Sequence, residues 1–414
     1  MLLNFSVKNF RSFKDKQSLS FVLDSGDRID KDLRFEIKNK SNKFRVLKNA
    51  LIFGANASGK SNIIDGIYVL ADLILSPITS SAEHFGIDTF GFNDEPTDFE
   101  VDLFINDKLY RYEISYSYTE VLREKLVCDD LIIFNRIKQD FNFLSLDGYL
   151  KEFLEKTVRK NSLLLFAAQS QNLQYSIEVF NWFSTLVNKD LSYYTDMLST
   201  NAKYKKKVLY GLKFADFNIV DIEIEKVKTP IGAAKIERYN SSNEKISIVR
   251  TEKNSIVETY VYFKHETNDK SFKLNLRSES SGTQQYFYLL LKLLDVSNKD
   301  VQVIIEDEFD RAIHKTLSKS IIKLLNTVES NMQFVSTTHN SSLMDALNKH
   351  QIYFVDKIPT GESEIYSLGD FEDIKVTRKD AKFSPKYEEG LYGATQIVNE
   401  SGLLSLMEES NEKT

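Results

Sequence analysis

The chain has 414 residues, and 60 Asp and Glu against 54 Lys and Arg give it a formal net charge of −6. That balance excludes a generally basic nucleic-acid-binding coat, so any nucleic-acid contact has to come from a local patch. A hydrophobic fraction of 42% is enough to bury a sizeable core and excludes wholesale disorder. The single cysteine, Cys128, excludes an internal disulfide and a cysteine-based zinc cluster. No apolar run approaches the ~20 residues of a membrane span and the N-terminus lacks a signal-peptide pattern, so we expect a cytoplasmic protein with no membrane partner.

In the first third of the chain the pattern predicts mainly β-structure. Residues 2–10 and 17–23 are typical of two short strands, and the apolar run 50–53 predicts a buried strand. Residues 98–118 alternate, with tyrosines at 110, 112, 116 and 118 on one face, which is the pattern of an antiparallel sheet. A tyrosine ladder can stack nucleic-acid bases, but packing in a half-buried sheet is the favoured interpretation.

The rest of the chain changes from helical to β periodicity and then to alternating elements. We predict helices between residues 150 and 214 and strands between 219 and 276, with 235–255 the most polar and least ordered stretch. From residue 278 onward, helices at 284–294 and 317–325 alternate with strands at 301–305, 333–336 and 351–355. That alternation is typical of a mostly parallel sheet. The sequence between residues 61 and 278 lacks sustained apolar heptads, so we expect no long coiled coil.

The segment Leu51–Asp65, LIFGANASGKSNIID, carries the most specific motif. It contains the complete phosphate-binding pattern G-x-x-x-x-G-K-S as Gly54, Gly59, Lys60 and Ser61, between a predicted strand and a predicted helix. Glycines let backbone N–H groups point at phosphate oxygens, and the helix N-terminus adds partial positive charge. Lys60 is placed to reach the β- and γ-phosphates, and the Ser61 hydroxyl to ligate Mg2+. We therefore predict a nucleoside triphosphate site.

A second group of candidate residues ends the apolar strand VIIEDEFD, residues 303–310. Such a strand delivers its carboxylates to the carboxyl edge of the sheet, where α/β proteins bind ligands. Asp307 is suited to hold Mg2+, directly or through water, and Glu308 to activate the attacking water as general base. Glu306 occupies a position that is normally apolar, and it either supports a neighbouring group or points to solvent. Taken alone, the run is equally typical of a solvated acidic turn.

Three further segments carry weaker signals. The run SESSGTQ, residues 278–284, precedes a helix and fits a second phosphate-binding surface through Ser280 and the Gly282 backbone, although ordinary helix capping has the same composition. His339, within STTHN at the end of a strand, is suited to bond a γ-phosphate, or it is a lone structural histidine. The segment DRAIH, residues 310–314, comes where a loop between two subunits would lie.

In this order the motifs resemble the ABC-type ATPase heads of the SMC, RecF and RecN group. The matching segments are Gly54–Ser61 for the Walker A loop, Val303–Glu308 for the Walker B strand, Glu279–Thr283 for the signature motif, Asp310–His314 for the D-loop and His339 for the switch histidine. The opening NFRSF run, Asn9–Phe13, matches the same group and places Arg11 near the nucleotide. The chain departs from the pattern because Glu279 and Ser281 replace the leading Leu and first Gly of the signature, and His314 replaces an Asp. A Q-loop is not evident, and Gln169 is only a candidate.

The segments ESSGT, DEFDRAIH and TTHN and the terminal run Tyr387–Gly393 resemble the AAA-type core domain or abortive-infection ATPases, including RloA-like and PARIS-type proteins, over nearly the whole chain. The resemblance implies an α/β P-loop NTPase fold of the ABC-ATPase-head type. A mixed or parallel sheet core would be accompanied by an antiparallel β lobe and a helical insertion. The implied division is an N-terminal half of the head (1–148), the insertion (149–215), a β-rich segment returning to the head (216–277) and the C-terminal half (278–414).

The resemblance also implies ligands and site residues. ATP and Mg2+ are expected, with Glu308 and His339 catalytic and with Ser61 and Asp307 at the metal. The full expectation is Arg11, Gly54, Asn56, Ser58, Gly59, Lys60, Ser61 and Asn62 for nucleotide binding, Ser280, Ser281, Gly282 and Thr283 for the signature acting in trans, and Asp310 and His314 for the D-loop.

The resulting hypothesis is an ATP-binding and hydrolysing switch that forms an ATP-dependent homodimer or higher oligomer. It would control a separate effector, TOPRIM-like or nuclease-like, in bacterial anti-phage defence. The alternative is a DNA-repair or DNA-clamp ATPase of the RecF or SMC kind. A self-sufficient nuclease is disfavoured because only about 75 residues follow His339, and their densest acidic run, Asp370–Asp373, is typical of a solvated turn. The basic run Lys203–Lys207 is more typical of a solvated helix face than of a nucleic-acid site.

Overall fold

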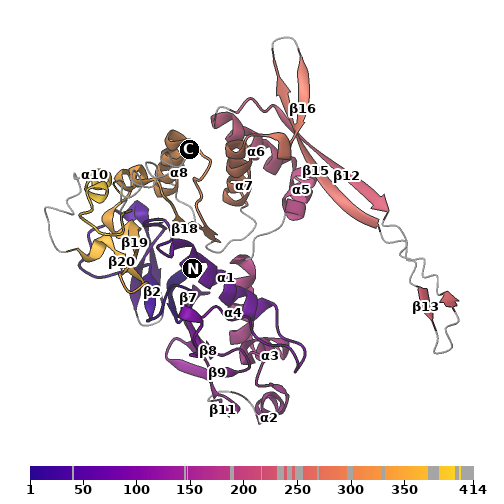
Figure 1. Ribbon diagram of the computed structural model, residues 1–414, viewed down its shortest axis with the longest axis vertical. Helices are drawn as coiled ribbons and strands as arrows, with labels where there is room; N and C mark the ends of the chain where they lie inside the picture. The colour runs from indigo at the N-terminus through magenta and orange to yellow at the C-terminus, as the bar shows by residue number, and fades with distance from the viewer. Residues whose placement is uncertain are drawn as a thin grey trace, which may run out of the picture. The chain divides into compact units, whose positions relative to one another are not determined.

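The computed structural model describes residues 1–39, 42–143, 146, 148–186, 191–215, 217–230, 237–239, 245–247, 255–267, 270–295, 302–327, 332–371, 382–396 and 401. The chain divides into two compact units. Unit 1 combines Met1–Asn188 with Ser297–Thr414, and unit 2 is the intervening Lys189–Val296. Helices and strands occur in both units (Figure 1).

A five-stranded sheet in unit 1 brings together strands from distant parts of the chain. Its strands are β6 (Asn49–Phe53), β17 (Gln302–Glu306), β18 (Met332–Thr337), β19 (Ile352–Lys357) and β20 (Ser363–Ser367). Their order is β17-β18-β6-β19-β20, and all neighbours are parallel except β19 and β20. The central strand β6 is buried along its whole length, which explains its unbroken apolar run. The carboxyl ends of four parallel strands therefore meet at one edge of this sheet.

A seven-stranded antiparallel sheet forms the second layer of unit 1. Its strands are β1 (Leu2–Lys8), β2 (Gln17–Ser20), β7 (Thr97–Ile105), β8 (Lys108–Tyr116), β9 (Val121–Cys128), β10 (Leu131–Ile137) and β11 (Asp140–Asn142), in the order β11-β10-β9-β8-β7-β1-β2. Tyr110, Tyr112 and Tyr116 on β8 are buried, which confirms that these tyrosines pack the core, whereas Tyr118 lies beyond the end of β8 and is exposed. A smaller sheet pairs β3 (Val22–Leu23), β5 (Lys43–Leu47) and β4 (Arg34–Lys38).

Helix α1 (Lys60–Leu75) packs between the two large sheets. A Cβ on Gly66 would lie 3.3 Å from the Phe5 ring of β1 and 3.5 Å from the Phe99 ring of β7, so the helix packs closely against that sheet. On the other side, the Tyr68 hydroxyl donates to the Ile305 carbonyl of β17 at 2.8 Å. The helices α2 (Gly148–Thr157), α3 (Leu164–Ser170), α4 (Gln174–Leu186), α8 (Lys315–Thr327) and α10 (Phe383–Glu388) complete the α-helices described for unit 1.

Two buried charged residues fix α3 against the antiparallel sheet. Glu124 and Arg136 are both fully buried, with Oε2 and Nη1 3.4 Å apart. The Glu124 carboxylate accepts hydrogen bonds from the Leu164 and Leu165 amides at 2.7 Å each, at the free N-terminus of α3. Burial raises the pKa of Glu124 and lowers that of Arg136, so each charge depends on its partners for stabilisation.

The described residues of unit 2 include three α-helices and a three-stranded sheet. Its elements are α5 (Leu191–Thr200), α6 (Ala202–Phe214), β12 (Asp221–Pro230), β15 (Ser255–Glu266), β16 (Ser271–Asn275) and α7 (Ser281–Leu293). The sheet is antiparallel in the order β12-β15-β16, and it is drawn as the long arrows of Figure 1. A separate hairpin pairs β13 (Glu237–Tyr239) with β14 (Lys245–Ser247). Most of residues 235–255, which the sequence marks as polar and poorly ordered, lie outside the described residues.

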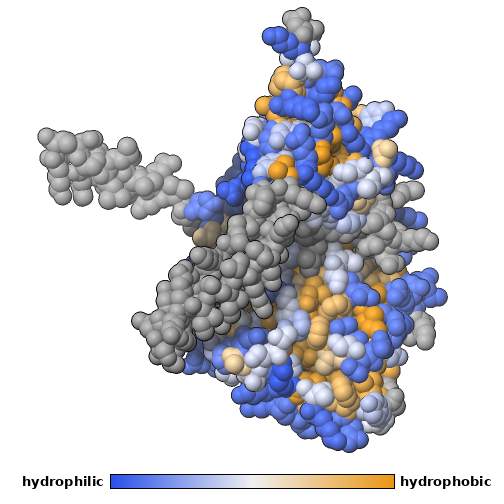
Figure 2. Space-filling model, turned by 90° about the vertical axis from the view of Figure 1, so that its right-hand side faces the viewer, coloured by the Kyte–Doolittle hydropathy of each residue, from blue (hydrophilic) through white to orange (hydrophobic). Residues whose placement is uncertain are grey.

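The architecture is the α/β P-loop fold that the sequence predicts. Helices and strands follow the predicted order, and the ends of β17, β18 and β19 differ from the predictions by no more than two residues. The longest α-helix in the described parts of the chain, α1, has 16 residues, so no long coiled coil occurs there. None of the described helices is long and apolar enough to cross a membrane. Hydrophilic and hydrophobic residues are interspersed on the face that Figure 2 presents.

Candidate nucleotide site

The predicted phosphate loop connects β6 to α1 and depends on two glycines. Gly59 has a φ of 107°, and a Cβ placed on it would lie 2.5 Å from Ser12 Oγ and 2.6 Å from Ser363 Oγ. A Cβ on Gly54 would collide with the Val355 carbonyl oxygen of β19. A side chain at either position would therefore push the loop off its neighbours. The loop begins at the carboxyl end of β6 and ends at the N-terminus of α1, as a phosphate-binding loop requires.

Lys60 is buried inside this loop, with only 5% of its surface exposed. Its amine donates hydrogen bonds to the carbonyl oxygens of Gly54 at 2.9 Å and Ala55 at 2.8 Å. Burial lowers the pKa of Lys60 to about 8, while the negative charges of Glu308 and Asp307 act in the opposite direction. The Ser58 hydroxyl is buried and has no hydrogen-bond partner among the described residues.

The acidic run after β17 reaches the same edge of the sheet. Ser61 Oγ donates to Asp307 Oδ1 at 3.1 Å, so the serine of the phosphate loop and the first exposed acid are in direct contact. The same Asp307 oxygen accepts a hydrogen bond from the Thr337 hydroxyl of β18. A hydroxyl and a carboxylate at this separation are hard oxygen ligands of the kind that Mg2+ prefers.

Glu308 adopts the left-handed backbone conformation, with a φ of 47°. Its amide donates to Thr337 Oγ1 at 2.8 Å. Its carboxylate lies 3.2 Å from Nε2 of His339 and 3.7 Å from Nε of Arg311. The structure thus brings the predicted general base and the predicted switch histidine together from two different strand ends.

The end of β18 holds the whole acidic run through successive hydroxyl groups. Ser336 Oγ donates to the Glu306 carbonyl at 2.7 Å, and Thr338 Oγ1 donates to Asp310 Oδ1 at 2.8 Å. Burial raises the pKa of Asp310. Sequence reasoning singled out only His339 in this segment and missed the supporting roles of Ser336, Thr337 and Thr338. The run of three hydroxyl residues directly before the histidine was the available signal.

A pocket of about 430 Å3 opens beside Glu308. Its lining includes Glu308, Asp310, Arg311, Lys315 and His339. The cations Arg311 and Lys315 give it a mixed charge that sequence reasoning did not anticipate. The pocket is large enough for solvent or for part of a ligand, and it adjoins the group predicted to activate water.

The N-terminal run NFRSF lies against the phosphate loop and α1. The Arg11 side chain donates to Asp88 Oδ2 at 3.1 Å, forms an ion pair with Asp65, and lies 3.5 Å from Asn62 Oδ1. Asn62 in turn donates to Ser12 Oγ at 2.8 Å. Arg11 and Asn62 are therefore adjacent, but the Arg11 charge is already matched by carboxylates of unit 1.

The remaining predicted residues of unit 1 have different surroundings. The Asn56 amide donates to Gln396 Oε1 at 3.0 Å, in the segment that follows α10. His314 precedes α8 and caps it, because its Nδ1 accepts from the Thr316 amide at 3.3 Å. The Gln169 side chain donates to Ser170 Oγ at 3.1 Å, a contact within α3. Glu306 is the last residue of β17 and is half-buried.

The predicted signature residues lie at the N-terminus of α7 in unit 2. Ser280 is the N-cap, and its Oγ accepts from the Thr283 amide at 3.1 Å. Thr283 is buried, Gly282 is half-buried, and Ser280 and Ser281 are exposed. The segment therefore presents an exposed helix N-terminus, which is compatible with both ordinary capping and an anion contact.

Comparison with known proteins assigns a family to these elements. Residues 50–345 match the family described as "AAA domain, putative AbiEii toxin, Type IV TA system". The chain belongs to this AAA family. No curated protein matches it in sequence.

Solved structures similar to this AAA protein include heads of SMC proteins. The SMC head domain from Thermotoga maritima has 16% identity and a TM-score of 0.40, with 88% of this chain and 98% of that chain covered. The SmcHead bound to the C-winged helix domain of ScpA has 12% identity and a TM-score of 0.45, with 91% and 99% covered. The Smc head domain with an extended coiled coil, bound to the C-terminal domain of ScpA derived from Pyrococcus furiosus, has 12% identity and a TM-score of 0.44, with 88% and 96% covered.

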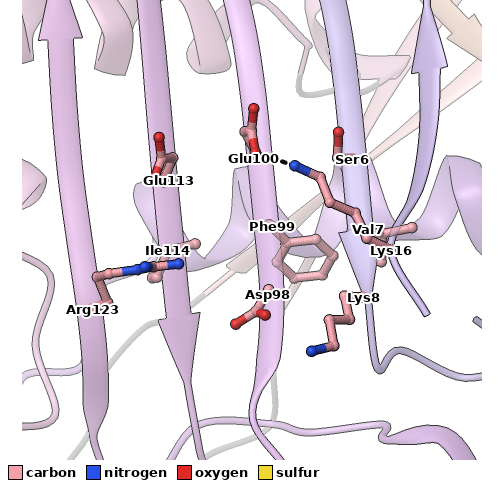
Figure 3. A pocket seen from close by; sticks show the side chains of 10 residues that line it. All are labelled: Ser6, Val7, Lys8, Lys16, Asp98, Phe99, Glu100, Glu113, Ile114 and Arg123. Atoms are coloured by element: carbon pink, nitrogen blue, oxygen red, sulfur yellow. Dashed lines mark hydrogen bonds and ion pairs between the residues drawn. The ribbon is translucent and has the colours of Figure 1, made fainter. Parts of the chain in front are cut away.

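Another hollow of the AAA protein, of about 90 Å3, lies on the antiparallel sheet (Figure 3). Charged side chains of both signs from neighbouring strands line it. Among them, Lys16 donates to Glu100 at 2.5 Å, and the lining residue Glu113 pairs with Lys125 outside the hollow at 3.7 Å. This is the chemistry of a solvated sheet face and not of a ligand site. The parts of the chain that the structure describes contain no group of three or more His, Cys, Asp or Glu placed to hold a metal by themselves.

Proposed function

We propose that this AAA-family protein binds ATP with Mg2+ and hydrolyses the ATP. In this proposal it acts as a switch in which the bound nucleotide controls whether two chains associate. One observation carries the proposal. Lys60, the Ser61–Asp307 pair and the Glu308–His339 pair lie where the parallel strands of the five-stranded sheet end. Groups that bind phosphate, suit a hard metal ion and activate water are the set that phosphoryl transfer to water needs.

Each residue has a distinct part in the proposed reaction. Lys60 would exchange its two carbonyl partners for oxygens of the β- and γ-phosphates. Ser61 and Asp307 would hold Mg2+, which when bound neutralises charge on the phosphate oxygens. Glu308 would take a proton from the attacking water. His339, bonded to the Glu308 carboxylate, would orient that group and contact the γ-phosphate.

The second half of the proposed site comes from another copy of the chain. Ser280, Ser281 and Gly282 would contact the γ-phosphate held by the partner's phosphate loop, and the segment Asp310–His314 would lie at the junction. A nucleotide that contacts both chains favours the closed dimer, and hydrolysis releases it. The exposure of Ser280 and Ser281 at a helix N-terminus supports this assignment.

The output of the switch is proposed to be a separate effector in anti-phage defence, of TOPRIM-like or nuclease-like chemistry. The family description, which refers to a toxin of a toxin–antitoxin system, supports a role of this class. A DNA clamp is the second candidate. Lys203, Lys206, Lys207 and Lys213 are exposed on α6, and Lys206 lies 5.8 Å from the exposed Tyr210 ring. Binding of DNA that Lys206→Glu and Lys207→Glu abolish would favour the clamp.

The first experiment tests nucleotide binding. Lys60→Ala removes the main fixed positive charge of the phosphate loop, so ATP affinity measured by calorimetry should fall below detection while the thermal midpoint stays unchanged. Lys156→Ala, which removes an exposed amine on α2 at 70% side-chain exposure, is the matched control and should bind ATP normally. Tight binding by Lys60→Ala would overturn the phosphate-loop assignment.

The second experiment tests whether the signature residues of one chain act on the nucleotide held by the phosphate loop of the other. Ser280→Arg places a long cation at the proposed contact and should block ATP-dependent dimerisation without weakening ATP binding by the monomer. Mixing Lys60→Ala chains with Ser280→Arg chains yields heterodimers with one fully intact composite site, so part of the ATPase activity should return. If heterodimers form and no mixing ratio restores activity, the shared site is refuted.

A further inference from the structure

A hydrogen bond within unit 2 joins His265, near the end of β15, to Glu279, the residue before the α7 N-cap. His265 Nε2 lies 2.7 Å from Glu279 Oε1, and the two side chains are only 13% and 8% exposed. Because an ionised carboxylate only accepts hydrogen bonds, Nε2 carries the proton. The imidazole stacks on Phe272 of β16, with ring centroids 5.2 Å apart, which fixes its orientation.

The main chain of Glu279 is held as firmly as its side chain. The Gln284 side-chain amide donates to the Glu279 carbonyl at 2.8 Å, and the Glu279 amide donates to the Leu276 carbonyl at 3.2 Å. The next residue, Ser280, caps α7 and is exposed. Glu279 is thus held in place directly before the turn Ser280–Gly282, whose first two residues are exposed.

The direction of the Glu279 carboxylate matters because the exposed turn is the next segment of the chain. A negative charge one residue before Ser280 would repel a phosphate approaching the N-terminus of α7. The contact with His265 holds the carboxylate against β15 and gives it a hydrogen-bond donor there, and only 8% of the Glu279 side chain stays exposed. Simple capping of α7 does not require this contact, because Ser280 already provides the cap.

We propose that His265 is a positioning residue for the signature turn. It withdraws the Glu279 carboxylate from the phosphate-binding face and fixes the turn that contacts the partner's nucleotide. This inference rests on the proposed function, because it assigns a role to His265 only if the α7 N-terminus acts on a second chain.

The test compares monomer and dimer properties of His265→Ala. ATP affinity of the monomer should stay unchanged, since the phosphate loop belongs to unit 1. ATP-dependent dimerisation, measured by sedimentation in the slow-hydrolysis Glu308→Gln background, should weaken by about tenfold or more, which is the usual loss for a hydrogen bond to a charged group. His265→Gln retains an N–H donor and should recover most of the dimer affinity.

Two controls separate positioning from general damage. Lys273→Ala removes an exposed ion pair with Glu223 in the same sheet and should leave dimerisation unchanged. In a Glu279→Gln background no carboxylate has to be held away from the phosphate. There His265→Ala should reduce dimer affinity much less than it does in the wild-type background. Mixing His265→Ala with Lys60→Ala chains should restore part of the ATPase activity, because one composite site is then intact.

The outcomes distinguish this inference from the proposed function. If the Glu308→Gln chain dimerises with ATP and Ser280→Arg prevents it, but His265→Ala dimerises normally, the inference alone is wrong. The inference is also refuted if His265→Ala and Glu279→Gln have additive effects on dimer affinity. It is refuted as well if His265→Ala lowers the ATP affinity of the monomer as much as it lowers dimer affinity. If the Glu308→Gln chain does not dimerise with ATP, the proposed function and this inference both fail.

Discussion

ATP binding should take up a proton at Lys60 and should weaken as the pH rises above 8. Without nucleotide the Lys60 amine lies buried against two carbonyl oxygens, and burial lowers its pKa from the ordinary 10.5 to about 8. The phosphates of bound ATP favour the ammonium form and return the pKa toward its ordinary range. Above pH 8 the free chain therefore holds fewer protons than the complex, so alkaline pH opposes binding.

The size of the effect depends on the fraction of Lys60 that is protonated before binding. With a pKa of about 8, that fraction is about nine tenths at pH 7 and about one tenth at pH 9. ATP affinity should therefore fall about tenfold between pH 7 and pH 9. Proton uptake should rise over the same interval from about 0.1 to about 0.9 per ATP bound.

Isothermal titration calorimetry in buffers of different ionisation enthalpy measures both quantities. Lys60→Arg is the matched control, since a guanidinium stays charged throughout this range. That variant should bind ATP more weakly than the wild type and with no decline between pH 7 and pH 9. A wild-type affinity that stays flat over this interval, or a decline of equal slope in Lys60→Arg, would refute the assignment of the titration to Lys60.

Three further substitutions test groups at the sheet edge and in the core. Glu308→Gln keeps the shape of the side chain but removes the proposed base, so turnover should fall by about 10²–10⁴-fold while ATP still binds. Glu306→Gln should lower turnover less. If Glu306→Gln is the more damaging in the ATPase assay, the assignment within the acidic run is wrong. Thr337→Val removes the hydroxyl shared by Asp307 and the Glu308 amide, so it should lower turnover more than ATP affinity, and unchanged turnover would contradict that role. Glu124→Ala leaves a buried guanidinium unpaired and should lower the free energy of unfolding by about 3–5 kcal/mol in urea denaturation, against at most about 0.5 for the exposed Lys156→Ala. A loss below about 1 kcal/mol for Glu124→Ala would show that the pair is not structural.

The parts of the site that could be predicted from the sequence are those encoded in short segments. The phosphate loop and the acidic run each combine a strand, a turn and chemically defined side chains within about ten residues, and pattern recognition needs no more. The order of strands and helices was predictable for the same reason, because the alternation of apolar runs is local. The residue roles at these positions stay predictions until the substitutions are made.

The contacts that sequence reasoning missed join residues far apart in the chain. Ser363 donates to the Ser58 carbonyl at 2.5 Å across 305 positions, and no local pattern indicates that pairing. The His265–Glu279 contact is closer in sequence but joins a strand to a turn in a segment without a recognised histidine motif. His314 shows the converse, because a residue assigned to the D-loop by resemblance also caps α8 through a local bond.

These distant contacts determine how the phosphate loop can respond to nucleotide. At Gly59 the loop packs against Ser12 and Ser363, because a Cβ on Gly59 would meet both serines. These two serines are themselves joined, since the Ser12 carbonyl accepts from the Ser363 amide at 2.8 Å. Val355 closes off the Gly54 end in the same way. Because neighbouring residues pack closely against both glycines, the backbone of the loop has little room to move. We therefore expect phosphate binding to change the contacts of the Lys60 amine more than the path of the backbone. The Lys60 amine has two carbonyl partners that phosphate oxygens can replace, and nucleotide binding changes its charge state. For this reason the titration of Lys60 should report nucleotide binding directly.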